Sequence, residues 1–176
     1  GLAEGHLPDN RPRQNEALAA ACPSEFPRPN AMASADTLDR LRPFYENPAI
    51  GKIGQNLKYD QIVLRGAGID LQGVVFDTMV ASYLLEAGTR THNLDDLAQR
   101  YLNHRPIPIE DLIGKGKSQK RMDQVPVAQV VEYAAEDADI PLRLYPILAD
   151  LLAQEGLAEL NATVEVPLIG VLAELE

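Results

Sequence analysis

The amino-acid sequence predicts an α/β fold that is rich in helix and has a small sheet. Two short apolar segments, 50–54 and 74–76, are typical of buried strands, and helical patterns follow each of them. Alternation of strand and helix is the pattern of a sheet covered by helices. The chain has 176 residues, 45% of them hydrophobic and 24% charged, which is typical of one globular domain with a tail.

The domain is expected to begin after a proline-rich segment. Residues 1–34 contain five prolines and no sustained period, so we predict an irregular or disordered segment with a short helix near 16–21. The domain itself is expected over residues 35–176. Its first helix is predicted over 37–45 and ends before the Asn47-Pro48 pair.

Polar cap residues and a glycine mark three helices in the middle of the chain. They are 57–67, begun by Asn56 and ended by Gly68; 78–86, begun by Asp77; and 94–102, begun by Asn93. Capping and the helix dipole explain Asp77 and Asp95 sufficiently, without a role in a site.

The last part of the chain is predicted to be mostly helical. The region 103–124 is rich in loop signals, with one helical turn near 109–113. A long helix is predicted over 127–154, interrupted or kinked near its two prolines, 141 and 146, and a last helix covers 164–175.

Composition excludes several classes of protein. A net charge of −10 argues against a general nucleic-acid coat, but not against an enzyme whose carboxylates are filled by divalent cations. The single cysteine, Cys22, excludes a disulfide framework and fits a reducing compartment. No membrane span or secretory signal is expected, because no apolar run is long enough and no basic start precedes one.

Asp60 falls inside the apolar stripe predicted for the helix 57–67. At about 100° per residue it lies about 60° from Leu57, on the side of Leu64. An isolated buried carboxylate there would need a cation, a hydrogen-bond donor or a solvent-filled cleft. Periodicity alone favours the simpler interpretation, a polar first-turn residue stabilised by the helix dipole. For Asn56, a cap role and a site role are compatible.

Tyr133 and Asp137 lie one helical turn apart and can address one point. The apolar stripe of this half of the long helix is predicted to contain Val127, Val130, Val131, Ala134 and Ala138. Asp137 lies at the edge of that stripe, whereas Glu132, Glu136 and Asp139 are expected to be solvated. Taken alone, the Tyr–Asp pair is better explained as a packing contact.

Five motifs give these residues a wider context. They are Ile-Gly-Gln-Asn-Leu-Lys-Tyr-Asp (53–60), Phe-Asp-Thr-Met (76–79), His-Asn-Leu-Asp-Asp-Leu-Ala (92–98), Gly-Lys-Gly-Lys-Ser-Gln (114–119) and Tyr-Ala-Ala-Glu-Asp-Ala-Asp (133–139). In order and spacing, over about residues 36–176, they resemble the proofreading 3′→5′ exonuclease domain of bacterial DNA polymerase I. The resemblance implies a ribonuclease H-like α/β fold and a DEDDy-type nuclease that releases 5′-mononucleotides from a single-stranded DNA 3′ end.

The resemblance also implies roles for residues. Asp137 would bind a first metal ion, Asp60 a second, and Asn56 would support the same cleft, while Tyr133 would orient the attacking water. The cofactors would be two Mg²⁺ or Mn²⁺ ions. Candidate contacts to the DNA backbone are Arg90, His92, Lys115, Lys117, Lys120 and Arg121. The basic run 115–121 is equally well explained as an exposed, solvated loop.

One family motif, an Asp-x-Glu on the first strand, has no counterpart in residues 1–34. We therefore expect the first strands of the fold to be missing or replaced, and a polymerase portion to follow Glu176 in a longer parent protein. A first metal without two of its carboxylates would bind weakly, so little or no nuclease activity is expected. Missing strands would also leave apolar helix faces uncovered.

Two other functions stay open. A ribonuclease D-like exoribonuclease shares the Tyr-x₃-Asp motif and the fold, although Asn-Leu-Lys-Tyr-Asp and Gly-Lys-Gly-Lys favour the polymerase family. A non-catalytic nucleic-acid-binding remnant is favoured by the missing Asp-x-Glu. In each case the expected location is the cytoplasm, in association with the nucleoid.

Overall fold

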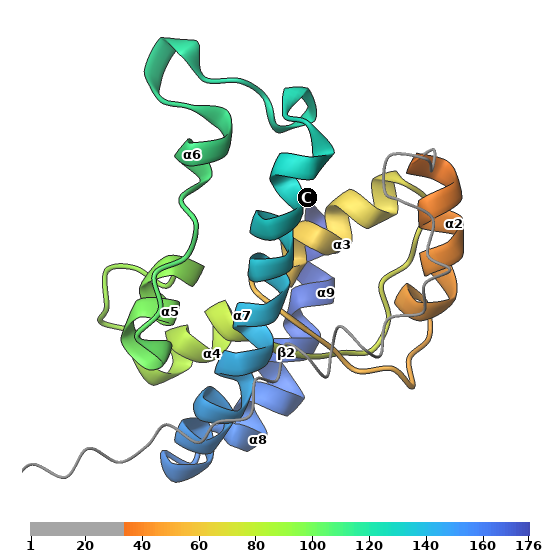
Figure 1. The fold of residues 1–176 in the computed structure, drawn as a ribbon. Helices are drawn as coiled ribbons and strands as arrows, with labels where there is room; N and C mark the ends of the chain where they lie inside the picture. Colours follow the sequence, from red (N-terminus) through yellow and green to blue (C-terminus); the bar gives the residue numbers. More distant parts are fainter. Residues whose placement is uncertain (1–33) are drawn as a thin grey trace, which may run out of the picture. The chain divides into compact units, whose positions relative to one another are not determined.

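The computed structural model describes residues 34–176, and Figure 1 shows how their helices and strands are arranged. The elements are α2 (Ser34–Tyr45), β1 (Lys52–Gly54), α3 (Leu57–Gly66), β2 (Val74–Asp77), α4 (Thr78–Leu85), α5 (Leu94–Leu102), α6 (Ile109–Ile113), the 3₁₀ turns η2 (Gly116–Ser118) and η3 (Met122–Gln124), α7 (Val127–Gln154), α8 (Ala158–Leu160), the π-helical turn η4 (Asn161–Glu165) and α9 (Val166–Leu175). The predicted helix-rich α/β architecture is confirmed. The predicted segment 1–34, with its helix at 16–21, lies almost wholly outside the described residues.

The sheet of the described part consists of β1 and β2, which pair in parallel. Parallel neighbours need a crossover connection, and α3 supplies it. The register places Gly54, the end of β1, opposite Asp77, the end of β2. Helix α4 begins directly after Asp77, and α3 begins three residues after Gly54, so their N-termini lie close to one another.

The main core lies where α7 packs against α4, α5 and β1. It is formed by Phe76, Ala81, Leu97, Ala98, Ile140, Leu144, Leu148 and Leu152. The four α7 residues are spaced four apart, which places them along one side of the helix. This buried side fixes the rotation of α7 and therefore the direction of every other side chain on it.

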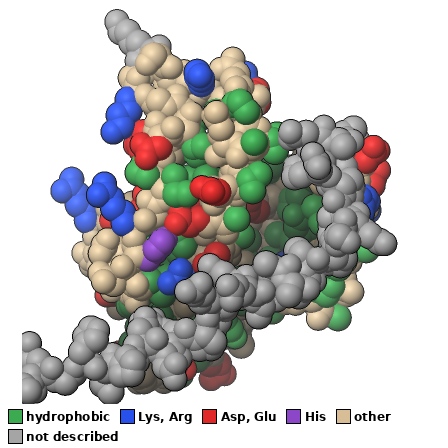
Figure 2. All heavy atoms as spheres, in the orientation of Figure 1, with side chains coloured by type: hydrophobic (Ala, Val, Ile, Leu, Met, Phe, Trp, Pro, Cys, Tyr) green, Lys and Arg blue, Asp and Glu red, His purple; other side chains and the backbone are tan. Residues whose placement is uncertain are grey.

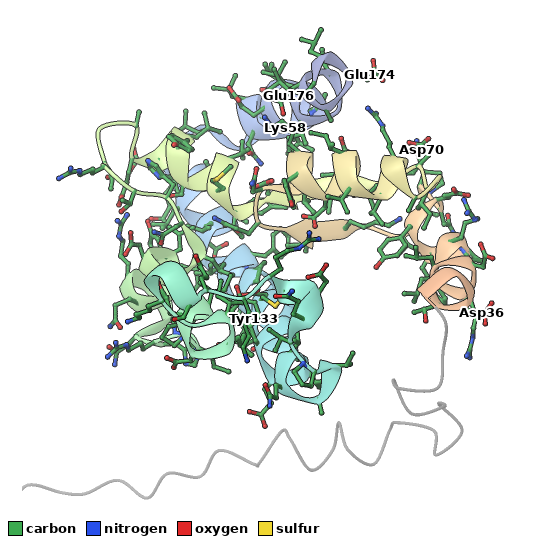
Figure 3. All side chains as sticks on the ribbon, turned by 90° about the horizontal axis from the view of Figure 1, so that it is seen from above. Asp36, Lys58, Asp70, Tyr133, Glu174 and Glu176 are labelled. Carbon is green, nitrogen blue, oxygen red and sulfur yellow. The ribbon has the colours of Figure 1, made fainter. Side chains whose placement is uncertain are left out.

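A second apolar cluster joins α3 to α9. Leu57, Leu71 and Ile169 form it. Two exposed ion pairs cross the same contact, Lys58 Nζ to Glu176 Oε1 at 2.6 Å and Arg65 Nη2 to Glu174 Oε1 at 3.6 Å (Figure 3). Exposed pairs of this kind contribute about 0–1 kcal/mol each, so apolar burial carries most of the contact.

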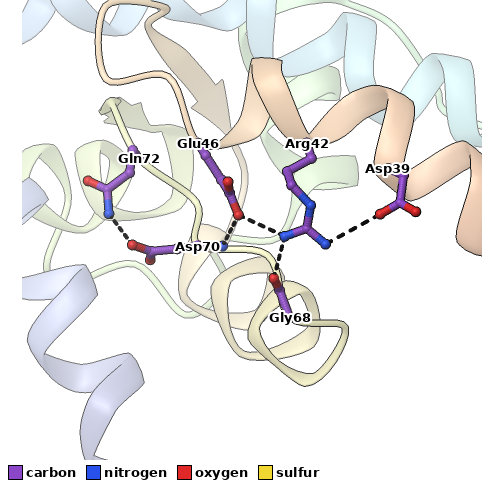
Figure 4. Close-up of polar contacts among 6 residues, drawn as sticks. All are labelled: Asp39, Arg42, Glu46, Gly68, Asp70 and Gln72. Atoms are coloured by element: carbon purple, nitrogen blue, oxygen red, sulfur yellow. Dashed lines mark hydrogen bonds and ion pairs between the residues drawn. The ribbon is translucent and has the colours of Figure 1, made fainter.

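Hydrogen bonds connect helix α2 to the turn that ends α3 (Figure 4). Arg42 Nη1 donates to the carbonyl oxygen of Gly68 at 2.5 Å and to Glu46 Oε1 at 2.9 Å. Glu46 Oε1 also accepts from the Asp70 amide at 3.2 Å. Gly68 has a φ of 74°, the left-handed conformation expected of a glycine that ends a helix.

The end of the chain differs from expectation in two ways. Helix α7 is not interrupted at its prolines, because it runs from Val127 to Gln154 and includes both of them. Pro141 is buried against the core, so packing offsets the hydrogen bond that a proline removes. The predicted helix 164–175 is in fact the end of a longer run, α8, η4 and α9.

The apolar stripe predicted for the start of α7 is not the core side of this helix. Val127 is 51% exposed and Val131 47% exposed. At about 100° per residue, Val131 lies about 180° from the buried Ile140. Helix α7 therefore has two apolar sides, and the described residues cover only one of them. None of the helices in residues 34–176 combines the length and hydropathy that a bilayer span requires.

Candidate active site

Tyr133 and Asp137 both lie on the core side of α7, beyond the end of its buried stripe. Each side chain is partly buried, and Figure 3 marks the position of Tyr133. Burial, followed by the nearby Asp137 charge, raises the pKa of Tyr133 to about 12. The phenol is therefore protonated at neutral pH and can both donate and accept hydrogen bonds. Each of the two side chains affects the pKa of the other, as expected of residues one helical turn apart.

Asp137 lies in an acidic environment. Burial raises the pKa of its carboxyl, and interaction with Tyr133 opposes the rise. The charges of Asp95 and Glu136 raise it further. Asp95 comes from the first turn of α5, where the sequence predicts only a residue stabilised by the helix dipole. No sequence pattern links it to Asp137, because the proximity arises from the packing of α5 on α7.

Glu136 was predicted to be solvated, and this was wrong. Its Oε1 lies 2.7 Å from His104 Nε2, and its Oε2 accepts from the Ile107 amide at 2.6 Å. Burial alone would raise the pKa of Glu136, but these two contacts hold it below the usual value. The loop after α5 is therefore attached to α7 one residue before Asp137.

An open cavity of about 450 Å³ lies in the same region. Its lining residues are Asp95, Asp96, Gln99, Arg105, Pro106 and Pro108. Asp95 thus faces the cavity and also influences Asp137. In Figure 2, acidic side chains lie among hydrophobic ones over the middle of the visible face.

Asp60 lies in the first turn of α3 and is exposed, not buried in the apolar stripe as predicted. The buried residues of α3 are Leu57 and Gln61, so Asp60 lies beside the buried side and not within it. Partial desolvation by the surrounding protein, followed by the charge of Asp77, raises the pKa of its carboxyl.

Asn56 does not cap α3 with its side chain, which corrects the predicted role. Its backbone is left-handed, with φ 58° and ψ 46°, and its side chain makes no cap hydrogen bond. The cap comes instead from Asp77, whose Oδ2 accepts from the Leu57 amide at 2.7 Å. Asp77 also caps α4, as the sequence predicted.

His92 is 4% exposed, so its imidazole does not face a nucleic acid in this conformation. Its Nδ1 lies 2.7 Å from Ser82 Oγ, and its ring packs on Tyr83 with centroids 3.8 Å apart. Its carbonyl oxygen accepts from Gln55 Nε2 at 2.8 Å. His92 therefore joins the loop before α5 to α4 and to the end of β1, and it is a poor candidate for contact with a phosphate.

Four of the remaining basic candidates lie on the surface. Arg90, Lys115, Lys120 and Arg121 are exposed, and Lys117 lies in the turn η2. Arg121 is paired with Asp123 at 2.7 Å. Figure 2 shows Lys and Arg side chains projecting from one side of the visible face. Their exposure fits both a solvated loop and a contact with nucleic acid.

Asp60 and Asp137 provide carboxylate oxygens, which suit Mg²⁺ or Mn²⁺ in kind. Two carboxylates are, however, too few ligands to hold such ions. Over residues 34–176, no group of three or more His, Cys, Asp or Glu side chains is placed to hold a metal ion. The charges that act on Asp60 and on Asp137 also come from different residues. These residues alone therefore do not form a complete metal site.

Comparison with known proteins identifies the class of this domain. A family model described as 3′-5′ exonuclease matches residues 21–153, which is most of the chain. The chain therefore belongs to this 3′-5′ exonuclease family, a family of enzymes with a ribonuclease H-like fold that in general depend on divalent metal ions.

The curated relatives of this chain are DNA polymerases I. The chain is 42% identical over 147 residues to DNA polymerase I of Rhizobium leguminosarum, covering 84% of this chain and 14% of the relative. It is 43% identical over 154 residues to DNA polymerase I of Pseudomonas aeruginosa, covering 82% of this chain and 17% of the relative. The predicted exonuclease domain of DNA polymerase I is confirmed at this level.

A solved structure agrees with this assignment. The POL domain of Pol1 from M. smegmatis, in complex with a DNA primer-template and dNTP, matches with a TM-score of 0.66 and 27% sequence identity. The match covers 84% of this chain and 22% of that chain. The present chain thus spans less than a quarter of the length of each of these three relatives.

Proposed function

We propose that this chain is the proofreading portion of a DNA polymerase I, a domain whose substrate is the single-stranded DNA 3′ end in the nucleoid of a bacterial cytoplasm. The observation that carries the proposal is the pair Tyr133 and Asp137, adjacent on one side of α7 within the region that the family model matches. Hydrolysis would release 5′-mononucleotides. A polymerase portion beyond Glu176 would be its covalent partner.

The proposal assigns a role to each residue. Asp137 would hold one divalent ion and Asp60 another, and such ions supply positive charge to the phosphate that is cleaved. Tyr133, protonated because burial and Asp137 raise its pKa, would orient the attacking water by a hydrogen bond. Asn56 would help shape the cleft beside Asp60.

We further propose that hydrolysis by this 176-residue chain is weak or absent. No Asp-x-Glu occurs anywhere in its sequence, so the carboxylates that would complete the site around Asp137 are not supplied by a first motif. The absence of a three-ligand group in residues 34–176 is consistent with this view. Affinity for a hard cation depends on the number of oxygen ligands, so the loss of two would weaken binding severely.

The proposal can be tested on the full chain. A 5′-labelled single-stranded DNA is incubated with the chain and Mg²⁺ or Mn²⁺, and shortened products are separated by size. We expect little or no product, and any product should require the metal and disappear with Asp137→Ala. The matched control is Asp150→Ala, an exposed acid on the same helix. Efficient metal-dependent digestion that survives Asp137→Ala would contradict the proposed site.

Binding experiments separate the remaining functions. Exposed Lys115 and Lys120 favour contact with a phosphate backbone, and such contacts weaken as salt rises. Salt-sensitive binding of DNA in EDTA, without turnover, would favour a non-catalytic remnant. Faster degradation of structured RNA than of DNA would favour a ribonuclease D-like enzyme.

A further inference from the structure

The buried carboxylate of Asp77, the last residue of β2, joins the beginnings of two helices. Asp77 is 1% exposed. Its Oδ1 accepts from the amides of Met79 at 2.9 Å and Val80 at 3.2 Å, in the first turn of α4. It also accepts from two amides at the start of α3, Leu57 at 2.7 Å and Asn56 at 3.2 Å.

Elementary energetics explains why one carboxylate occupies this position. The first amides of a helix have no partner within the helix, and a negative charge is stabilised at a helix N-terminus. A buried carboxylate without partners would be costly, but hydrogen bonds from amides offset that cost. The parallel register of Gly54 and Asp77 brings both helix starts within reach of the same side chain.

Asp77 also controls the turn that leads into α3. Asn56 is one of two non-glycine residues with positive φ in residues 34–176. This conformation is sparsely populated by non-glycine residues and persists only where its surroundings enforce it. The Asp77 hydrogen bonds to the amides of Asn56 and Leu57 are contacts that do so. Asp60 follows in the first turn of α3, and the charge of Asp77 acts on it.

We propose that Asp77 is the positioning residue of the candidate metal site: by fixing the left-handed Asn56 and the first turn of α3, it sets where the Asp60 carboxylate lies. The inference rests on the proposed function, in which Asp60 is a metal ligand and its position therefore affects metal binding. Asp77 itself need not touch metal or substrate. It acts through the backbone, from a strand 17 residues after Asp60 in the chain.

Two variants isolate this role. Asp77→Asn keeps the size of the side chain but offers one acceptor oxygen, so it can cap α4 only by turning its NH₂ group toward the Leu57 amide. Asp77→Ser keeps a good cap residue for α4 but is too short to serve α3 as well. Both should therefore lose the contact with Leu57 and retain α4. The matched control is Asn93→Ala, which removes the 2.8 Å cap bond to the Asp96 amide and leaves α3 untouched.

The readouts are amide hydrogen exchange and paramagnetic broadening by Mn²⁺, both recorded by NMR on the ¹⁵N-labelled full chain. In both Asp77 variants we expect exchange at Leu57 to become at least about tenfold faster, because its amide loses its partner. Broadening of amide signals around Asp60 at a fixed Mn²⁺ concentration should fall, while broadening around Asp137 stays. In Asn93→Ala, exchange should rise at Asp96, and broadening around Asp60 should not change.

Each outcome bears on one hypothesis. Unchanged exchange at Leu57, or unchanged broadening around Asp60 despite faster exchange, would overturn the positioning role. Loss of cooperative folding in both Asp77 variants would also overturn it, because Asp77 would then be a residue of general stability. If the unsubstituted chain shows no broadening around Asp60, the proposed metal role of Asp60 fails. The exchange data would still decide whether Asp77 holds the start of α3.

Discussion

Glu136 Oε1 lies 2.7 Å from Nε2 of His104, a residue 32 positions earlier in the chain. The same carboxylate accepts from the Ile107 amide at 2.6 Å. One acidic side chain therefore satisfies a ring nitrogen and a backbone amide of the loop that leads from α5 to α6. Since Asp137 is the next residue, this contact connects the candidate active site with the loop that contains Arg105.

Replacement of Glu136 by alanine should destabilise the domain. Glu136→Ala leaves the Ile107 amide without its acceptor, and an unsatisfied, partly buried group costs about 1–3 kcal/mol. Glu132→Ala, an exposed acid on the same helix, should change the free energy of unfolding by no more than about 0.5 kcal/mol. Urea denaturation of both variants measures the difference. Equal effects would mean that the contact with the loop contributes nothing.

The same contact predicts a dependence on pH. The folded state lowers the pKa of Glu136, so this group contributes stability above its unfolded pKa of about 4.3. That contribution is lost as pH falls through the lower, folded value. The difference in unfolding free energy between the unsubstituted chain and Glu136→Ala should therefore be present at about pH 5 and shrink below about pH 4. A difference that grows on acidification would contradict the sign.

The contribution of Asp137 to stability should change with pH in the opposite direction to that of Glu136. Its folded-state pKa is raised, so its contribution to stability is complete below the usual value of 3.8 and is lost as pH rises through the folded value. Asp137→Asn should therefore stabilise the metal-free chain at pH 7, by less than about 1 kcal/mol for a partly exposed group. The gain should fade as the pH approaches 4. Asp150→Asn is the control, and thermal unfolding at several pH values is the measurement.

The two apolar sides of α7 should differ in energetic importance. Leu148 is fully buried, and Leu148→Ala should cost about 2–5 kcal/mol in unfolding free energy. Val131 is 47% exposed, and Val131→Ala should cost no more than about 0.5 kcal/mol. Chemical denaturation of the two variants tests the contrast. A cost for Val131→Ala as large as that for Leu148→Ala would show that something covers that side.

Two glycines with similar backbone angles should respond differently to alanine. Gly68 and Gly73 have φ of 74° and 72°. A Cβ at Gly68 meets nothing within 4 Å, so Gly68→Ala should cost only the left-handed backbone, about 1–2 kcal/mol. A Cβ at Gly73 would lie 2.7 Å from the Ile50 carbonyl oxygen, so Gly73→Ala should cost clearly more. Similar melting temperatures for the two variants would contradict this expectation.

Local signals in the sequence located most helices correctly. Asp77 and Asn93 cap the helices that follow them, because a cap bond spans only two or three residues. Tyr133 and Asp137 meet because they lie one turn apart on a single helix. Such relationships depend on spacing along the chain and can therefore be predicted without knowledge of tertiary contacts.

The errors concern contacts between distant segments. Asn56 is of a residue type that commonly caps helices, but its side chain does not cap α3. Asp77 caps α3 instead, because the pairing of β1 with β2 brings it close to the Leu57 amide. Glu136 lies opposite the predicted apolar stripe, as expected, but that side of α7 is the one that packs against other elements. Glu136 therefore contacts His104 and is not solvated. His92 has no local pattern that reveals its burial against Ser82. In each case the decisive partner comes from another element.

The hydrogen bonds of Asp77 have a consequence for the order of events on the ribosome. The Leu57 amide finds its acceptor 20 residues later in the chain, so the start of α3 stays incomplete until β2 has been synthesised. Because the same carboxylate also completes α4, we expect β1, α3, β2 and α4 to gain protection together, as one cooperative unit. Nascent chains that end before residue 77 should therefore contain an α3 whose first turn is frayed.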